Sequence, residues 1–253
     1  MKKIILRADD LGYSEGVNYG IARTIRKGKV RTVGLIVNLE YSKQGYELIK
    51  DEDICLGLHV NISSGYPVNE SEKLSSLVNE NKEFKSSRIY NQSKYDFVVF
   101  SEVYEEVEAQ YFRFKEITSR EPDYIEGHAV FHETYFRAIE TVAEKYHIPY
   151  IPVLTSPNET FLFCGTRLHF WMESMNPDYE PCRTFEKMCT VEREDCEVMV
   201  FHPGYIDDYL LSHSSLLLPR VKEVEFLTGR SFDEDICRYH VELVTYRELK
   251  RGL

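Results

Sequence analysis

Short apolar runs, each followed at once by an acidic or histidine residue, recur along this chain and constrain its fold more than any other feature. The first run ends at Asp9 and Asp10, and three later runs end at His59, His128 and His202. Runs of this kind are typical of buried parallel strands. The carboxyl ends of parallel strands meet at one face of an α/β protein, where active sites form. We therefore expect these side chains to converge.

Helix-like segments alternate with the apolar runs from the start of the chain to its end. The expected strands are residues 3–8, 30–38, 54–60, 124–128, 150–153, 197–201 and 241–246, and the expected helices include 15–27, 42–50, 97–119, 133–145 and 219–228. This repeated pattern predicts an α/β fold in which about seven parallel strands form a (β/α) barrel-like sheet, a deformed TIM-like barrel. Without an internal repeat or a linker, residues 1–253 are expected to form a single catalytic domain.

Two long irregular stretches interrupt the alternation, at residues 62–95 and 155–183. The first is rich in polar residues and is too long for an ordinary connection in a compact domain. It is either a disordered linker or a cover over the active site, and its position after His59 favours the cover. The second contains Trp171, the only tryptophan, and we expect it to be another loop near the active-site mouth. Its aromatic side chains fit either sugar stacking or core packing.

The adjacent acids Asp9 and Asp10 can serve one site only where their strand ends, because successive strand residues point to opposite faces. Asp10, His59 and His128 offer a carboxylate and two imidazoles, a set that suits Zn²⁺ or another divalent ion such as Mg²⁺. Such an ion activates a bound water and polarises a carbonyl group. Asp9 is then the candidate general base, and His202 the candidate general acid.

Two further residues are candidates for binding substrate. His132 lies four residues after His128 and is either a metal ligand or a residue that faces the cleft. Arg220 follows Pro219 at a predicted helix start and either reaches the cleft or is an ordinary exposed arginine. The remaining histidines are expected at the surface; they are His147, His169, His213 and His240.

The overall charge and composition exclude several classes of partner. A formal net charge of −11 argues against binding to nucleic acid or to an anionic membrane surface. No apolar run reaches the roughly 18–20 residues of a membrane span. The short apolar start predicts that there is no signal peptide, so we expect a cytoplasmic protein with six reduced cysteines. A homodimer is the default expectation for its assembly.

The motifs around these residues resemble, in order, those of the YdjC-like (ChbG) carbohydrate deacetylases; they are ADDLGYSEGVNYGI, GLHVN, the HxxxH of GHAVFH, HPGY and PRVKEVEFLTG. The resemblance implies a barrel-like fold and a divalent metal that serves to remove an acetyl group from an N-acetylated sugar, such as a chitin-derived disaccharide. It also implies metal ligation by Asp10, His59 and His128, with Asp9 as the base and His202 as the acid.

The chain departs from the family pattern at a few positions near these motifs. Leu11 stands where members usually have Phe, which is a small packing change. Glu126 stands where they have Asp, and Ala129 and Val130 replace further histidines. The active-site mouth is therefore expected to differ from that of the best-known members.

The sequence is best interpreted as a metal-dependent hydrolase that removes the N-acetyl group from an amino sugar or a short chitooligosaccharide. One alternative is a non-catalytic metal- or sugar-binding protein of the same fold. Another is a different enzyme with a metal site of two histidines and one carboxylate, such as an iron oxygenase. The presence of Asp9 and His202 beside the predicted ligands favours hydrolysis.

Overall fold

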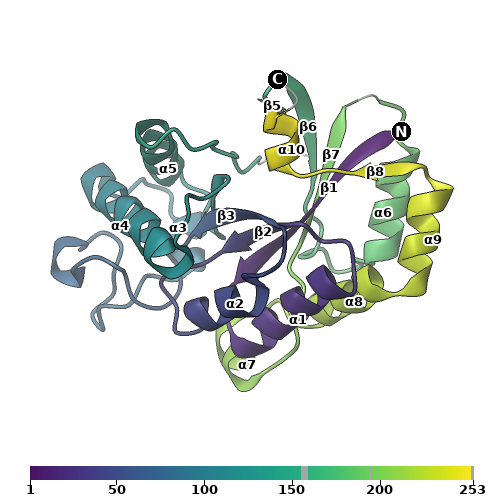
Figure 1. The fold of residues 1–253 in the computed structure, drawn as a ribbon. Helices are drawn as coiled ribbons and strands as arrows, with labels where there is room; N and C mark the ends of the chain where they lie inside the picture. The colour runs from purple at the N-terminus through teal and green to yellow at the C-terminus, as the bar shows by residue number, and fades with distance from the viewer. Residues whose placement is uncertain (155–158, 194, 252–253) are drawn as a thin grey trace.

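A curled sheet with helices along its outer side forms the core of the computed structural model, which describes residues 1–154, 159–193 and 195–251 (Figure 1). The described residues form eight strands: β1 (Lys2–Leu11), β2 (Thr32–Leu35), β3 (Cys55–Val60), β4 (Ile125–Gly127), β5 (Thr160–Phe163), β6 (Thr166–Trp171), β7 (Cys196–Phe201) and β8 (Val241–Leu243). The helices are α1 (Glu15–Arg26), α2 (Ser42–Ile49), α3 (Ser87–Gln92), α4 (Phe100–Thr118), α5 (Glu133–Lys145), α6 (Pro181–Thr190), α7 (Asp208–His213), α8 (Leu218–Thr228), α9 (Arg230–Arg238) and α10 (Tyr246–Arg251), with a short 3₁₀ turn at Ser71–Lys73.

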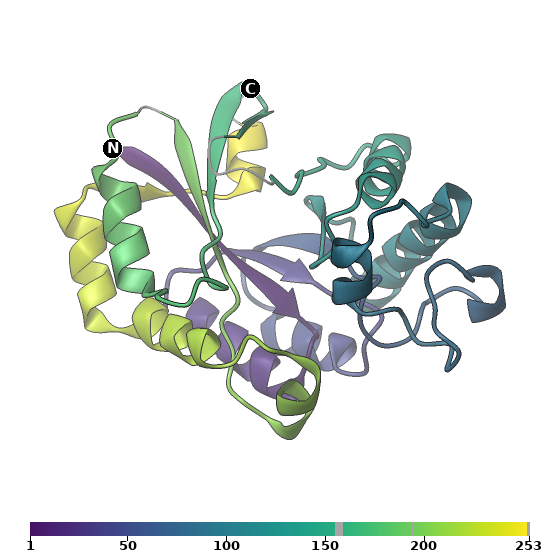
Figure 2. The ribbon, with the colours of Figure 1, turned by 180° about the vertical axis from the view of Figure 1, so that it is seen from behind.

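Seven of the strands follow one another in the order β4-β3-β2-β1-β7-β6-β5, and β8 pairs with the start of β1. Every pairing is parallel except that of β5 with β6. The sheet curls into an incomplete barrel, which Figure 2 shows from behind. The predicted α/β fold, a deformed TIM-like barrel, is therefore confirmed.

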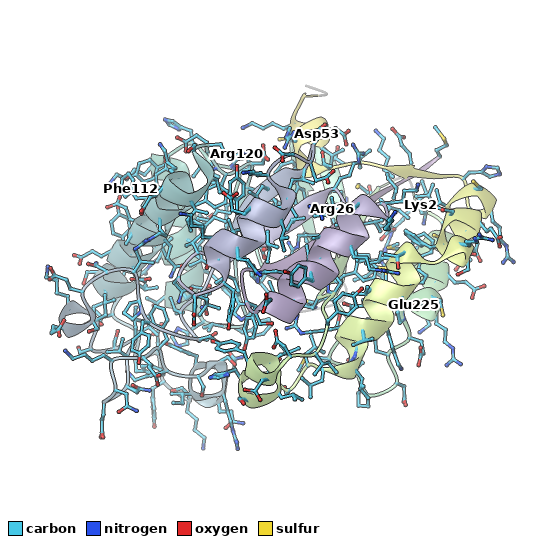
Figure 3. All side chains as sticks on the ribbon, turned by 60° about the horizontal axis from the view of Figure 1, so that its bottom comes forward. Lys2, Arg26, Asp53, Phe112, Arg120 and Glu225 are labelled. Atoms are coloured by element: carbon cyan, nitrogen blue, oxygen red, sulfur yellow. The ribbon has the colours of Figure 1, made fainter. Side chains whose placement is uncertain are left out.

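The two faces of the sheet bury different sets of side chains. On β1, Ile4 and Leu6 pack in the large core between sheet and helices, whereas Ile5 joins a smaller apolar cluster on the opposite face, within the curl. Arg7 and Asp9 follow Ile5 on this inner face, because strand side chains alternate. The helices α1 and α8 pack against each other and expose charged residues such as Arg26 and Glu225 to solvent (Figure 3). The polar side chains of Arg7 and Asp9 thus follow the small apolar cluster on the inner face of the sheet.

The clearest difference from the predicted elements lies in the second half of the chain. Residues 150–153 do not form a strand; Tyr150 makes only an isolated bridge with Ile125. The stretch expected to be a loop over 155–183 contains the β5–β6 hairpin and the beginning of α6, while residues 155–158 lie outside the described part. The hairpin was missed because its alternation of apolar and polar residues is short and irregular.

The polar stretch 62–95 packs against the domain even though most of it is irregular. Leu74, Leu77 and Tyr90 are buried, and the Glu106 carboxylate on α4 accepts hydrogen bonds from the backbone N–H groups of residues 68 and 69. The segment is therefore an ordered part of the fold rather than a disordered linker. Its role as a cover over the active site stays a prediction.

All six cysteines lie in the described part of the chain and are unpaired. None of the described helices combines the length and the apolar composition that crossing a membrane requires.

Candidate active site

The site begins where β1 loses its regular geometry. Asp10 has a left-handed φ of 75°, and the register with β2 shifts by one residue between Ala8 and Leu11. Such an irregularity turns a side chain away from the strict alternation of a strand. Asp9 therefore stays on the inner face, while Asp10 turns toward the carboxyl ends of β3 and β4. The expectation that both acids can serve one site at the strand end agrees with this geometry.

Three predicted ligands meet at this point. Asp10 Oδ1 lies 3.0 Å from His128 Nδ1 and 3.3 Å from His59 Nε2, and the two ring nitrogens are 3.0 Å apart. His59 is carried by β3, and the backbone N–H of His128 donates to Val60 O at 2.8 Å, which holds the end of β4 beside β3. All three side chains are buried or nearly so.

The geometry of these atoms fits a divalent cation. Ligand atoms that surround Zn²⁺ tetrahedrally at about 2.0–2.1 Å are about 3.3 Å apart, close to the spacings of this triangle. Asp10 Oδ1 is buried, faces only the two imidazole nitrogens, and makes no hydrogen bond of ordinary geometry among the described residues. A buried carboxylate oxygen without a donor is unfavourable unless a cation faces it. Asp10, His59 and His128 could therefore hold a metal ion with coordination positions left open.

Arg220 holds the other oxygen of the Asp10 carboxylate. Its Nη2 donates to Asp10 Oδ2 at 2.7 Å, and its Nη1 donates to His202 O at 3.2 Å. Arg220 is only 3% exposed, so the alternative of an ordinary exposed arginine is wrong. Although burial opposes the charge of Asp10, His128 and Arg220 hold the pKa of this carboxyl well below its usual range. Asp10 is thus an anionic ligand with a fixed orientation.

A second acidic group lies beneath the triangle and is balanced by an arginine. Arg7 Nη2 lies 2.9 Å from Asp9 Oδ2 and 3.3 Å from Glu126 Oε2, and Glu126 Oε1 lies 2.6 Å from His59 Nδ1. Asp9, His59 and Glu126 are also close enough to hold a cation. However, the Arg7 guanidinium already places one positive charge beside both carboxylates of this second group, which favours the triangle with Asp10 as the metal site.

Burial and charge shift the pKa values of this group in opposite directions. Burial raises the pKa of Asp9, and the neighbouring Arg7 only partly opposes that shift. Burial disfavours the charged form of His59, but Glu126 and Asp9 outweigh it and raise the pKa of His59 to about 10. A proton therefore competes with a metal ion for His59, and binding of the metal would release it.

Glycine at position 34 makes room for this cluster. A Cβ atom at Gly34 on β2 would lie 2.9 Å from Glu126 Oε1, 3.2 Å from His59 Cβ and 3.3 Å from Asp9 Oδ1. The inner face of β2 thus leaves space where its neighbouring strands place charged side chains. Sequence reasoning did not assign a role to Arg7, although a charged residue on the inner face of a buried strand was a usable signal.

His202 and His132 occupy different surroundings. His202 follows β7, is half-buried, and is joined to Asp10 through the hydrogen bonds of Arg220. Burial lowers the pKa of His202 to about 4, although Asp10 and Asp9 oppose the shift. His132 lies beside Asp96, with Nδ1 at 3.4 Å from its Oδ1, and is outside the ligand triangle. Its predicted role in binding substrate stays a prediction.

The tryptophan and the histidine of the second irregular stretch are half-buried and lie beside acidic side chains. Trp171 donates from Nε1 to Glu197 Oε2 at 2.7 Å and packs against the outer core. His169 Nε2 lies 2.7 Å from Asp195 Oδ2. Core packing therefore explains Trp171 without a sugar ligand.

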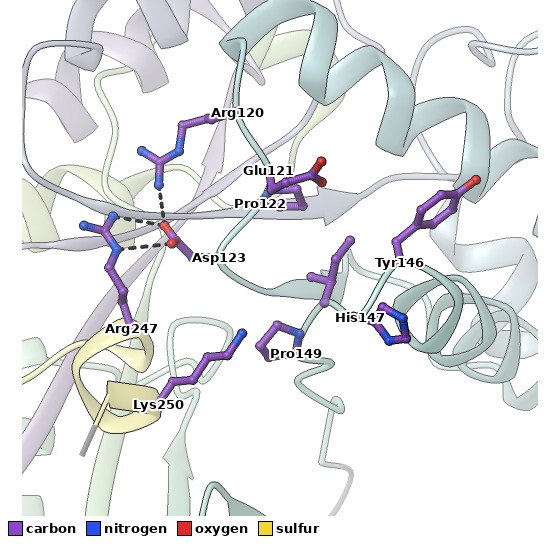
Figure 4. Close-up of a pocket in the computed structure, with 10 residues that line it drawn as sticks. Arg120, Glu121, Pro122, Asp123, Tyr146, His147, Pro149, Arg247 and Lys250 are labelled. Carbon is purple, nitrogen blue, oxygen red and sulfur yellow. Dashed lines mark hydrogen bonds and ion pairs between the residues drawn. The ribbon is translucent and has the colours of Figure 1, made fainter. Parts of the chain in front are cut away.

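A separate cavity of about 740 Å³ lies at the amino ends of the strands, opposite the ligand triangle (Figure 4). Asp123 lines it and is paired with Arg120 at 2.6 Å and with Arg247 at 3.0 Å. The cavity shares no residue with the ligand triangle, and the Asp123 carboxylate is already balanced by two arginines.

Comparison with known proteins gives one consistent result. The model of the family described as YdjC-like protein matches residues 3–238. The chain is 31% identical to a carbohydrate deacetylase of Geobacillus stearothermophilus, covering 96% of both chains. It is 28% identical to carbohydrate deacetylase 2 of Listeria innocua, covering 98% of this chain and 99% of the relative. Its fold matches a crystal structure from Enterococcus faecalis V583, described as a candidate cellobiose-phosphate cleavage protein, with a TM-score of 0.81, 24% identity and 98% coverage of each chain.

Proposed function

Because this chain belongs to the family of YdjC-like proteins, we propose that it is a metal-dependent carbohydrate deacetylase, a hydrolase that removes the N-acetyl group from an amino sugar or a short chitooligosaccharide. The names of its relatives from Geobacillus and Listeria support the reaction class. The single observation that carries the metal dependence is the triangle of Asp10, His59 and His128, in which one buried carboxylate oxygen faces two imidazole nitrogens.

The residues around the triangle suit hydrolysis of an amide. A divalent ion held there, with Mg²⁺ and Zn²⁺ as the leading candidates, would activate a water molecule and polarise the acetyl oxygen. Asp9 uses Oδ2 to bind Arg7, while its buried Oδ1 has no hydrogen-bond partner within the described chain. That oxygen is therefore free to accept a proton from the water, which makes Asp9 the general base.

His202 delivers a proton to the amine nitrogen as its bond to the acetyl carbon breaks, and the products are acetate and a free amine. The proton must reach His202 during turnover, because the lowered pKa of this histidine keeps it neutral beforehand. Arg220 orients Asp10 through the hydrogen bond to its second oxygen, and its contact with substrate stays a prediction.

The family and the charge of the chain support a small sugar as the substrate. A small N-acetylated sugar suits a protein with a formal net charge of −11 better than nucleic acid does. The Enterococcus protein of similar fold is described in connection with a sugar phosphate, which makes phosphorylated sugars a second group to test. A cytoplasmic location and a homodimer stay predictions.

The test is release of acetate from N-acetylglucosamine, diacetylchitobiose and their 6-phosphates, measured after chelation and after addition of Mg²⁺, Zn²⁺, Co²⁺ or Fe²⁺. We expect acetate only with metal, and we expect His59→Asn to abolish it. His147→Asn is the matched control, because His147 is exposed and lines the opposite cavity. Unchanged activity in His59→Asn would contradict the proposal. Oxygen consumption with Fe²⁺ and no acetate would favour an oxygenase, and metal and sugar binding without turnover would favour a binding protein.

A further inference from the structure

A buried hydroxyl–carboxylate pair lies directly behind His202 and has no part in the reaction as described so far. Ser174 is 1% exposed and Glu223 is fully buried. The two residues come from distant parts of the chain, since Ser174 follows β6 and Glu223 lies in α8. A carboxylate that is fully buried is costly unless its oxygens accept hydrogen bonds, so the partners of Glu223 reveal its role.

Each oxygen of the Glu223 carboxylate is linked to His202. One accepts from the backbone N–H of His202, and the other accepts from the Ser174 hydroxyl, which contacts the His202 ring. The backbone N–H of His202 donates to Glu223 Oε2 at 2.6 Å. Ser174 Oγ donates to Glu223 Oε1, also at 2.6 Å, and lies 3.3 Å from His202 Nδ1. The carboxylate, the hydroxyl and the histidine thus form a ring of contacts, and the buried Tyr179 hydroxyl is a further neighbour of Glu223 and Ser174.

The supply of hydrogen atoms in this ring determines which nitrogen of His202 carries a proton. A serine hydroxyl has a single hydrogen, and Ser174 gives it to the Glu223 carboxylate. The contact with His202 can then form only if Nδ1–H donates to a lone pair of Ser174 Oγ. A neutral imidazole that is protonated on Nδ1 has its lone pair on Nε2.

We propose that Ser174 and Glu223 are positioning residues that hold neutral His202 with its proton on Nδ1 and its Nε2 lone pair free for the reaction. This inference rests on the proposed function. In the reaction, Asp9 takes one proton of the attacking water; the second proton of that water is taken up at Nε2 and is delivered to the amine nitrogen as the C–N bond breaks, which gives acetate and a free amine and leaves His202 neutral again. The charge of Glu223, transmitted through Ser174, stabilises the imidazolium that exists between these two steps.

The tautomer of His202 can be measured directly by ¹⁵N NMR of protein labelled at histidine, with its signals assigned by their loss in His202→Gln. Burial raises the pKa of Glu223 to about 7, so the spectra are recorded at about pH 8, where the carboxylate is ionised. We expect a protonated Nδ1 and an unprotonated Nε2. In Ser174→Ala we expect a mixture of tautomers and a kcat about 10- to 100-fold lower, with KM and bound metal unchanged.

Ser76→Ala is the matched control, because Ser76 Oγ also donates to a glutamate, Glu102 Oε2 at 2.7 Å, in the 62–95 segment. It should leave the His202 tautomer and kcat unchanged. A second variant, Glu223→Gln, covers the case in which Ser174→Ala does not fold. The new amide donates to Ser174, whose hydroxyl then donates to Nδ1, so the proton of His202 should move to Nε2.

Two results would overturn the inference: wild-type His202 protonated on Nε2, or a tautomer and kcat that Ser174→Ala leaves unchanged. If the wild-type protein releases no acetate from any sugar, the proposed function fails. The spectra would still report whether Ser174 and Glu223 set the tautomer, so the two failures are distinguishable.

Discussion

Asp10 and Asp123 lie at opposite ends of the same curled sheet. Each accepts hydrogen bonds from arginine, but only Asp10 has an oxygen without a hydrogen bond among the described residues. At the amino end, Asp123 Oδ2 accepts from Arg120 at 2.6 Å and from the Leu56 N–H at 2.8 Å, and Oδ1 accepts from Arg247 at 3.1 Å (Figure 4). At the carboxyl end, Arg220 holds Asp10 Oδ2, whereas Oδ1 faces two imidazoles and makes no hydrogen bond of ordinary geometry among the described residues.

The comparison separates the two charge clusters by whether a carboxylate oxygen lacks a hydrogen bond: both oxygens of Asp123 accept one, whereas Asp10 Oδ1 does not. Both oxygens of Asp123 accept hydrogen bonds, and its pairing with Arg247 joins α10 to the loop before β4. Only Oδ2 of Asp10 accepts a hydrogen bond from arginine. Oδ1 faces two imidazole nitrogens that could bind a cation together with it. Both ends are rich in charge, but the pattern of partners separates a structural network from a chemical one.

The largest effect is expected when the charge of Asp10 or of Asp123 is removed, which tests the difference between the two ends of the sheet directly. Asp10→Asn should lower metal affinity, measured by calorimetry, by more than about 100-fold, because a charged ligand is lost rather than a supporting partner. Asp123→Asn should leave metal affinity and acetate release unchanged and should lower the free energy of unfolding by about 1–3 kcal/mol, because charged hydrogen bonds to two arginines are lost. Equal effects of the two variants on metal affinity would show that the distinction between the ends is wrong.

A smaller effect is expected from the carboxylate behind the ligand His59. Glu126→Gln should weaken metal binding by about 10- to 100-fold, because Glu126 Oε1 lies 2.6 Å from His59 Nδ1 and orients that ring. The control is Glu121→Gln, an exposed glutamate that lines the opposite cavity. Calorimetry that finds the same metal affinity in Glu126→Gln and wild type would remove Glu126 from the site.

The smallest effect concerns Glu106, a buried carboxylate that is saturated by hydrogen bonds but has no cation. Burial raises the pKa of Glu106 to about 6, against its ordinary value of 4.5. The folded state therefore favours the protonated form of Glu106. The contribution of this protonation to the free energy of unfolding is fully present below about pH 4.5 and is lost as the pH rises through about 6. Glu106→Gln should remove this dependence, with a change of no more than about 2 kcal/mol relative to wild type.

Urea unfolding of both proteins at pH 4.5 and 7.5 measures the effect. The free energy of unfolding of Glu106→Gln relative to wild type should increase between the two pH values. A difference that stays constant, or that decreases, would contradict the assignment. The variant keeps only one acceptor oxygen, so the N–H group of residue 68 or that of residue 69 loses its hydrogen bond at both pH values, and only the change between the two pH values reports the titration of Glu106.

Much of the fold and the ligand triangle could be predicted because the relevant signals are local in the chain. An apolar run followed by an acid or a histidine specifies both a buried strand and the end at which the polar side chain appears. This is why Asp10, His59 and His128 were found without a structure. The hairpin at β5–β6 was missed because short strands that pair with each other depend on tertiary packing more than on pattern.

The sequence by itself determined the parallel α/β sheet and the convergence of Asp9, Asp10 and the histidines, because strand periodicity and parallel pairing leave little freedom in where strand ends lie. Only the tertiary structure decided which charges balance them. The partners of Asp10 and His202, namely Arg220 and Glu223, lie on α8, and Arg220 is 210 residues from Asp10 in the chain. Contacts over such separations depend on how helices dock on the sheet, and no local pattern of residues encodes that.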